Sequence, residues 1–145
     1  MKSGLDLARE LLQKAENDLA AARVGFGHGA PLDTVCFHLQ QAVEKLLKAA
    51  LNCHAIAYPR THDIDELMEL ALASFPAIAP FTDRFEAFSA YAVEFRYSTD
   101  FYPSREEVSA GLASVEDFRA ILHTLLPEEA LPCGPQGPGG AGPPR

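Results

Sequence analysis

Apolar residues recur every three or four positions along most of this chain, which is the spacing of amphipathic helices. Residues 5–23 carry one such stripe, and the glycine-rich run over residues 25–29 predicts the turn that ends the first helix. Residues 32–52 carry a stripe from Leu32 to Cys53 that steps by three and four without a fault. Further apolar positions widen this second stripe, so we expect the second helix to be the most buried one.

Three further helices are predicted downstream. A helix starts near Thr61, where Asp63 and Glu66 have the spacing of an N-terminal cap. The next helix begins at Phe81 and carries four phenylalanines on one stripe, and the last helix opens at Ser104 with a capping box and stops at Pro127. No window alternates apolar and polar residues for long enough to form a strand. The pattern therefore predicts an all-α fold, an antiparallel bundle of about five helices.

The composition changes at Pro127. The 19 residues 127–145 include six prolines and five glycines, which can neither propagate a helix nor bury much surface. We therefore expect a helical domain over residues 1–126 and a disordered Pro/Gly-rich tail over residues 127–145.

The overall composition narrows the functional classes. The chain has 145 residues, 48% of them hydrophobic, and a formal charge of −8, which excludes disorder of the whole chain and argues against a broad basic face for nucleic acid. No apolar run is long enough to span a membrane, and charges appear too early for a secretory signal, so we expect a cytoplasmic protein without a membrane partner. The three cysteines are irregularly spaced, and we expect no metal site and no cofactor.

The aromatic stripe of the fourth helix bears on assembly. Four phenylalanines on one stripe favour a surface that a second subunit completes, and we expect a homodimer. The alternative is that these rings only fill the core of the monomer.

Three polar clusters could carry chemistry. Lys45 and Lys48 lie one turn apart on the polar side of the second helix, where they could hold a phosphate or simply form a solvated face with a Glu44–Lys48 pair. The segment from Arg60 to Asp63 could bind an anion at a helix N-terminus or only cap that helix. Arg96 with Tyr97 could bind a phosphate and a base, or Arg96 could complement the helix dipole.

Three matches in the right order resemble one known family. Residues 37–49, FHLQQAVEKLLKA, resemble the Q-A-x-E-K-x-x-K-A signature of HEPN domains. The segment Thr61-His62-Asp63-Ile64 is similar to the T-H-D-L element that follows it there, and residues 91–100 resemble the Y-x-x-x-x-R-Y-P-D stretch, with Ser98 in place of proline. This resemblance implies an up-and-down four-helix core and usually a homodimer. It also implies a small nucleotidyltransferase encoded beside the protein in a toxin–antitoxin-like pair.

Many members of that family are metal-independent ribonucleases with an R-x4-6-H motif, and others bind nucleotides or partner proteins. Here the positions that follow Arg96 at that spacing hold Phe101, Tyr102 and Pro103, so the usual histidine is absent. The pair Arg23 and His28, at the end of the first helix, also fits this spacing. About one such match is expected by chance in the whole chain.

The sequence therefore leaves enzymatic activity open. Our first hypothesis is a HEPN-type homodimer that pairs with a nucleotidyltransferase and binds a nucleotide or phosphate through Lys45, Lys48, His62, Arg96 and Tyr97. The second is a metal-independent endoribonuclease toxin in which Arg96 acts with His62, or with His38, as a substitute. The third is a protein-interaction module without a ligand.

Overall fold

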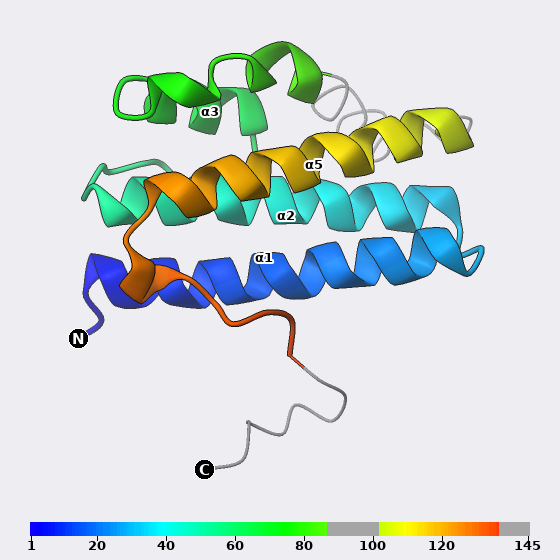
Figure 1. The fold of residues 1–145 in the computed structure, drawn as a ribbon. Helices are drawn as coiled ribbons and strands as arrows, with labels where there is room; N and C mark the ends of the chain where they lie inside the picture. Colours follow the sequence, from blue (N-terminus) through cyan, green and yellow to red (C-terminus); the bar gives the residue numbers. More distant parts are fainter. Residues whose placement is uncertain (87–101, 137–145) are drawn as a thin grey trace.

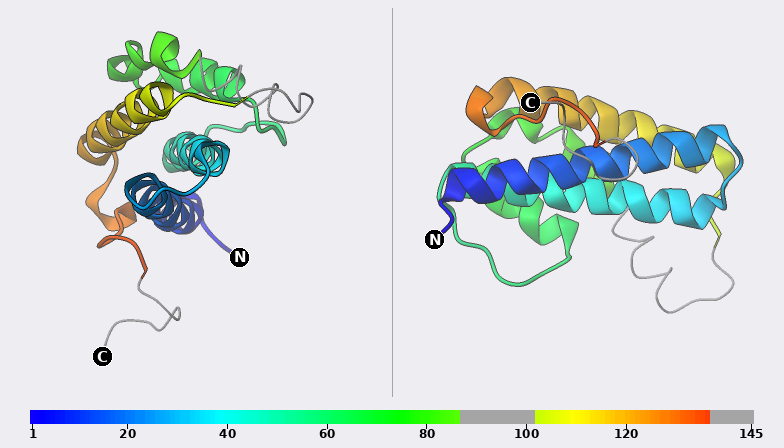
Figure 2. Two further views of the ribbon diagram at one scale, coloured as in Figure 1. Left: turned by 90° about the vertical axis from the view of Figure 1, so that its right-hand side faces the viewer. Right: turned by 90° about the horizontal axis from the view of Figure 1, so that it is seen from below.

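The computed structural model describes residues 1–86 and 102–136 and shows an all-α fold (Figure 1). The long helices α1 (Gly4–Gly27) and α2 (Leu32–Cys53) form an antiparallel pair, and α5 (Arg105–Leu125) lies along both of them. A second layer holds α3 (Ile64–Leu72), the short 3-10 helix η1 (Pro76–Ile78) and the helical residues 81–86 (Figure 2). No strand occurs within residues 1–86 and 102–136.

Small side chains bring α1 and α2 close together. Alanines repeat every seven residues on both helices and are almost completely buried; they are Ala8, Ala15 and Ala22 on α1 with Ala42 and Ala49 on α2. Leucines such as Leu12 and Leu39 fill the positions between them. A seven-residue repeat keeps one stripe facing its partner along the whole helix, and small residues shorten the distance between the axes. The second helix buries eleven residues against six for α1, which confirms it as the most buried.

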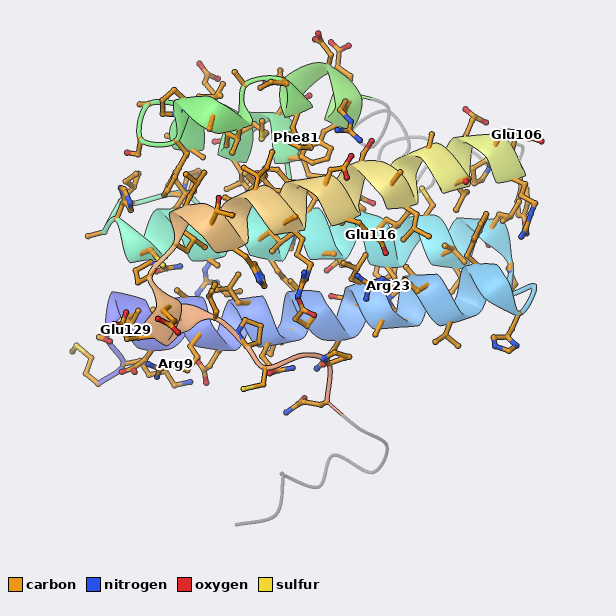
Figure 3. The ribbon with its side chains drawn as sticks, in the orientation of Figure 1. Arg9, Arg23, Phe81, Glu106, Glu116 and Glu129 are labelled. Carbon is orange, nitrogen blue, oxygen red and sulfur yellow. The ribbon has the colours of Figure 1, made fainter. Side chains whose placement is uncertain are left out.

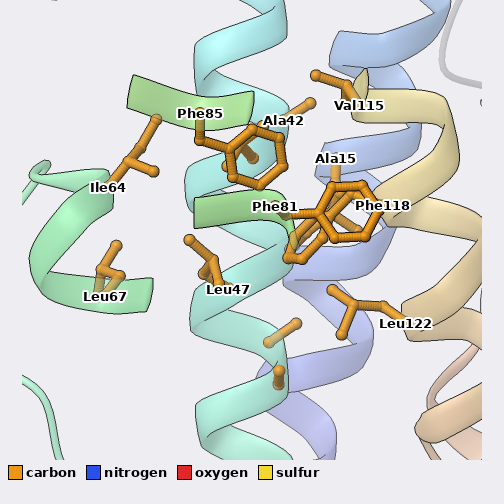
Figure 4. Packing of buried hydrophobic residues seen from close by; sticks show 14 of the residues in the cluster. Ala15, Ala42, Leu47, Ile64, Leu67, Phe81, Phe85, Val115, Phe118 and Leu122 are labelled. Carbon is orange, nitrogen blue, oxygen red and sulfur yellow. The ribbon is translucent and has the colours of Figure 1, made fainter. Parts of the chain in front are cut away.

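Aromatic rings join the second layer to α5 (Figure 4). The centroids of Phe81 and Phe85 lie 5.1 Å and 4.9 Å from that of Phe118, and all three side chains are buried within the single chain. Such edge-on contacts add to the stabilisation from burial itself. The first two phenylalanines of the predicted stripe therefore fill the core of the monomer, while Phe88 and Phe95 lie outside the described residues.

The predicted helix starts agree with the local capping geometry. Ser104 caps α5 through a capping box with Glu107, as expected from the sequence. Asp63 caps α3, so this helix begins at Ile64, slightly later than the predicted start near Thr61. The first helix runs to Gly27 instead of ending before Gly25, because only Gly29 takes a positive φ, +77°. The turn thus needs one glycine, and the earlier two continue the helix.

Residues 127–136, which we call the C-terminal strap, lie against α1 (Figure 1). The 3-10 helix η2 (Glu128–Ala130) starts this segment, and Ala130 is completely buried. The expectation of disorder from Pro127 onward is therefore wrong for these ten residues. Residues 127–136 have little apolar surface of their own, but polar side chains of α1 form hydrogen bonds with them. Residues 137–145 lie outside the described residues, and the division into a domain and a tail stays a prediction.

Candidate functional site

The polar side of α2 lies against α1 and the segment before α3, and two carboxylates organise it, the partly buried Asp18 and the buried Glu44. Asp18, on α1, accepts a hydrogen bond from the Lys45 ammonium and lies with Oδ1 3.0 Å from Nδ1 of His38. All three side chains are partly or largely buried. The alternative of a solvated face is therefore wrong for Lys45, because its ammonium is held between two helices.

Glu44 organises the second group in the same way. Its Oε2 accepts a hydrogen bond of 3.1 Å from Nζ of Lys48, which confirms the predicted pair one helical turn apart. Nδ1 of His62 lies 3.0 Å and 3.1 Å from the two carboxylate oxygens. The Glu44 side chain is only 6% exposed and that of His62 is 65% exposed. A buried carboxylate thus holds an exposed imidazole.

This geometry defines the proton positions on His62. An ionised carboxylate only accepts hydrogen bonds, so Nδ1 of His62 carries the proton that it donates to Glu44. The second ring nitrogen, Nε2, is then an acceptor in the neutral imidazole and a donor in the protonated one. A group that can take up or release a proton therefore stands at the exposed edge of the cluster.

The two sequence elements meet at Glu44. Glu44 and Lys48 belong to the stretch over residues 37–49, and His62 belongs to the Thr61-His62-Asp63 segment. The remaining residues of that segment are used locally, since Thr61 Oγ1 accepts from the Asp63 amide at 3.0 Å and Asp63 caps α3. The Asp63 carboxylate binds the amides of Asp65 and Glu66, so the cap interpretation is confirmed and the helix end offers fewer N–H groups to an anion.

The formal charges of these groups cancel. Asp18 and Glu44 carry two negative charges, and Lys45 and Lys48 carry two positive ones, so these four groups sum to zero. Any anion that binds here competes with the internal carboxylates for the two ammonium groups.

A third carboxylate lies between α1 and α5. Glu16 is almost completely buried and accepts a hydrogen bond from Nε of Arg119, while Nε2 of His123 lies 3.8 Å from the same oxygen. That distance is too long for a hydrogen bond, and the buried Nε2 has no hydrogen-bond partner among residues 1–86 and 102–136. Burial, and secondarily the Arg119 charge, lowers the pKa of His123, while Glu16 opposes this effect. Burial therefore favours the neutral form of His123 over the charged one.

The remaining predicted residues cannot be placed in this geometry. Arg96 and Tyr97 lie outside the described residues, so their distance from His62 is open. Arg23 pairs with Glu116 of α5, whereas His28 forms the exposed C-cap of α1. Arg23 and His28, which fit the R-x4-H spacing, therefore have separate structural roles.

Sequence reasoning missed Asp18 and the buried Glu16. Both lie on α1 among the apolar positions Ala15 and Leu19, and a charged residue inside an apolar stripe is a sign of a buried partner. Which cation each one meets depends on the register of α1 against α2 and α5. Within residues 1–86 and 102–136, no three side chains of His, Cys, Asp or Glu gather as a metal site would need.

The chain is a small all-α domain in which α2 carries Lys45, Lys48 and His38 beside carboxylates, and His62 joins them from the segment before α3. Comparison with protein-family models matches the HEPN domain over residues 8–125, and the chain belongs to this family. A search of curated proteins and a search of solved structures give no match. None of the helices in the described residues combines the length and apolarity needed to cross a membrane.

Proposed function

We propose that this HEPN protein forms a homodimer that binds a nucleotide or phosphate group and pairs with a nucleotidyltransferase in a toxin–antitoxin-like module. The observation that carries the proposal is the exposed His62 imidazole, held by Glu44 with the Lys48 ammonium on the same carboxylate. In its protonated form His62 offers Nε2–H to a phosphate oxygen, and the Lys48 ammonium is bound to the same Glu44 carboxylate. Lys45, Arg96 and Tyr97 complete the candidate set as sequence-based assignments.

The acidity of the chain favours a small ligand over bulk RNA. A formal charge of −8 opposes the release of counterions that drives binding to a long polyanion. One phosphate group needs only a local pair of donors, which an exposed histidine beside a lysine supplies.

Calorimetry tests this site directly. Titrations of the full chain with a nucleoside triphosphate and with inorganic phosphate should release heat that is lost in His62→Gln and retained in His28→Gln. The control changes the exposed histidine that caps the C-terminal end of α1. Absence of heat for the unmutated protein would refute ligand binding and favour the protein-interaction module.

Assembly and partner need separate measurements. Light scattering should give twice the chain mass of 15.7 kDa for a homodimer. Co-purification with the nucleotidyltransferase encoded by a neighbouring gene should give a stable complex. A monomeric mass at micromolar concentration would contradict the dimer.

A second candidate, a metal-independent endoribonuclease, is favoured by the orientation of His62. With Nδ1 bonded to Glu44, the other nitrogen of this exposed imidazole, Nε2, is left to accept the proton of a ribose 2′-hydroxyl. RNA cleavage in the presence of EDTA that disappears in both His62→Gln and Arg96→Ala would support this activity. Intact RNA after long incubation with concentrated protein would exclude it.

A further inference from the structure

His123 lies in the last turn of α5, just before the chain leaves this helix for the C-terminal strap. The last hydrogen bond of the helix joins the Leu126 amide to the Leu122 carbonyl at 2.9 Å, and the strap starts with the next residue, Pro127. Leu126 and Ala130 are both buried, so the helix end and the start of the strap pack into the same core. A change that opens the last turn of α5 therefore also moves the strap.

The rest of the strap is held by hydrogen bonds from three side chains of α1 spaced four residues apart. The contacts are Arg9 Nε to Glu129 O at 3.0 Å (Figure 3), Gln13 Nε2 to Gly134 O at 2.9 Å, and the Gln136 amide to Asn17 Oδ1 at 2.9 Å. Cys133, Pro135 and Gln136 are exposed. A segment with little buried apolar surface and exposed hydrogen bonds opens at a lower free energy than the core of a protein.

Glu16 connects this part of α1 to His123. It precedes Asn17, its side chain is 3% exposed, and its Oε1 accepts a hydrogen bond from Nε of Arg119. Nε2 of His123 lies 3.8 Å from the same oxygen and has no hydrogen-bond partner within the part of the chain that the structure describes. Glu16 and Arg119 neutralise each other while His123 is uncharged. A proton on His123 therefore adds a second positive charge beside a carboxylate that is already paired.

The electrostatic surroundings of His123 are simple. Within residues 1–86 and 102–136, the charges that act on it come from Glu16 of α1 and Arg119 of its own helix. The other charged groups of neighbouring elements have partners of their own or are exposed; they are Arg9 and Arg23 of α1, Lys45 and Lys48 of α2, Arg84 of residues 81–86 and the two glutamates of η2. One carboxylate, one guanidinium and the exclusion of water thus set the titration of this imidazole.

A protonated His123 is more stable outside the cluster than inside it. In the buried position it shares Glu16 with the Arg119 guanidinium, and burial followed by the Arg119 charge lowers the pKa of His123. At the surface the charged ring is hydrated and lies beside the last carbonyl groups of α5, where the helix dipole favours a cation. The side chain is already 16% exposed, so the ring reaches water by a short outward movement.

We propose that His123 is a pH-sensitive latch for the C-terminal strap: uptake of a proton moves the imidazole away from Glu16, opens the last turn of α5 and releases the strap from α1. The direction follows from linkage. The closed form has a His123 pKa below 6.5, whereas the ring in the open form is hydrated, so the closed form loses stability as the pH falls below 6.5. Carboxyl groups ordinarily titrate near about pH 4, so the range from about pH 5 to pH 7 tests the histidines.

Amide hydrogen exchange of the full chain over this pH range tests the latch. Exchange rates divided into the intrinsic rates at each pH give protection factors for the amides of Leu126 and Gln136. We expect both factors to fall as the pH falls, by up to about tenfold per pH unit, the limit for uptake of one proton. Both should also be smaller than the factor of Leu46 in the middle of α2, because the strap opens locally. Equal protection at all three amides would indicate global unfolding and overturn the proposal.

Variants at two histidines identify the titrating group. His123→Leu and His123→Gln remove the proton-binding ring with an apolar and a polar side chain, and either should make the protection of Leu126 and Gln136 independent of pH. His28→Gln removes the exposed histidine that caps α1 and should retain the dependence on pH. Constant protection in the unmutated chain, or an unchanged pH dependence in the His123 variants, would refute the latch.

Discussion

Replacing Lys48 by methionine removes a largely buried ion pair, and the same change at Lys2 removes an exposed one for comparison. The Lys48 ammonium lies 3.1 Å from Glu44, and the two side chains are 16% and 6% exposed. The Lys2 ammonium lies closer to its partner, 2.7 Å from Glu10, but these side chains are 60% and 49% exposed. If burial decides the contribution of an ion pair, the longer pair should matter more than the shorter one.

The expected magnitudes follow from what each change leaves behind. Removing one partner of a fully buried pair costs about 3–5 kcal/mol, since the other charge stays without compensation. Glu44 keeps the hydrogen bond from His62, and Lys48 is not fully buried, so we expect about 1.5–3 kcal/mol for Lys48→Met, the range of a hydrogen bond to a charged group. For Lys2→Met we expect about 0.2–1 kcal/mol.

Urea unfolding measures both free energies of unfolding from the shift in midpoint at an unchanged m-value. The double variant Glu44→Gln, Lys48→Met should lose less than the sum of the single variants, because the glutamine removes the unpaired charge. Equal losses for Lys48→Met and Lys2→Met would refute the reasoning. So would strict additivity at Glu44 and Lys48.

Four further substitutions test the backbone conformation at single positions and the titration of His123. Gly4→Ala places its Cβ 2.6 Å from the Asn52 carbonyl oxygen and should cost about 1–3 kcal/mol in urea unfolding; Gly27→Ala meets nothing within 4 Å and should stabilise by about 0.5–1 kcal/mol. Ala55 has a φ of +54°, so Ala55→Gly should raise the free energy of unfolding by about 0.5–1 kcal/mol, and a loss would contradict this. Because burial lowers the pKa of His123 from 6.5, its stabilising contribution is complete above pH 6.5 and declines as the pH falls below that value. In His123→Leu, thermal unfolding should show a weaker loss of stability below pH 6.5, and an unchanged profile would refute this assignment.

Local patterns were enough to predict most helix boundaries. Ser104 and Asp63 cap their helices because the side-chain oxygen of each accepts a hydrogen bond from a backbone amide two or three residues later. The uninterrupted stripe of α2 likewise predicted the most buried helix. The first helix end was predicted too early, since the glycines before Gly29 tolerate helical angles and only the turn itself required a positive φ.

The candidate site was predictable only in part. The Glu44–Lys48 pair lies within one helix, so the spacing of four residues identified it directly. The links from Glu44 to His62 and from Asp18 to Lys45 join different segments. They give His62 and Lys45 partners on other segments, which no spacing along a single helix could reveal.

The sequence by itself determined the all-α class, the helix caps and the family resemblance, because these depend on spacing within about ten residues. The tertiary structure decided which carboxylate neutralises which cation and that residues 127–136 bind α1. Those outcomes depend on the register and burial of helices far apart in the sequence. A buried charge acquires its partner, and a proline-rich segment its hydrogen bonds, only when the helices have packed.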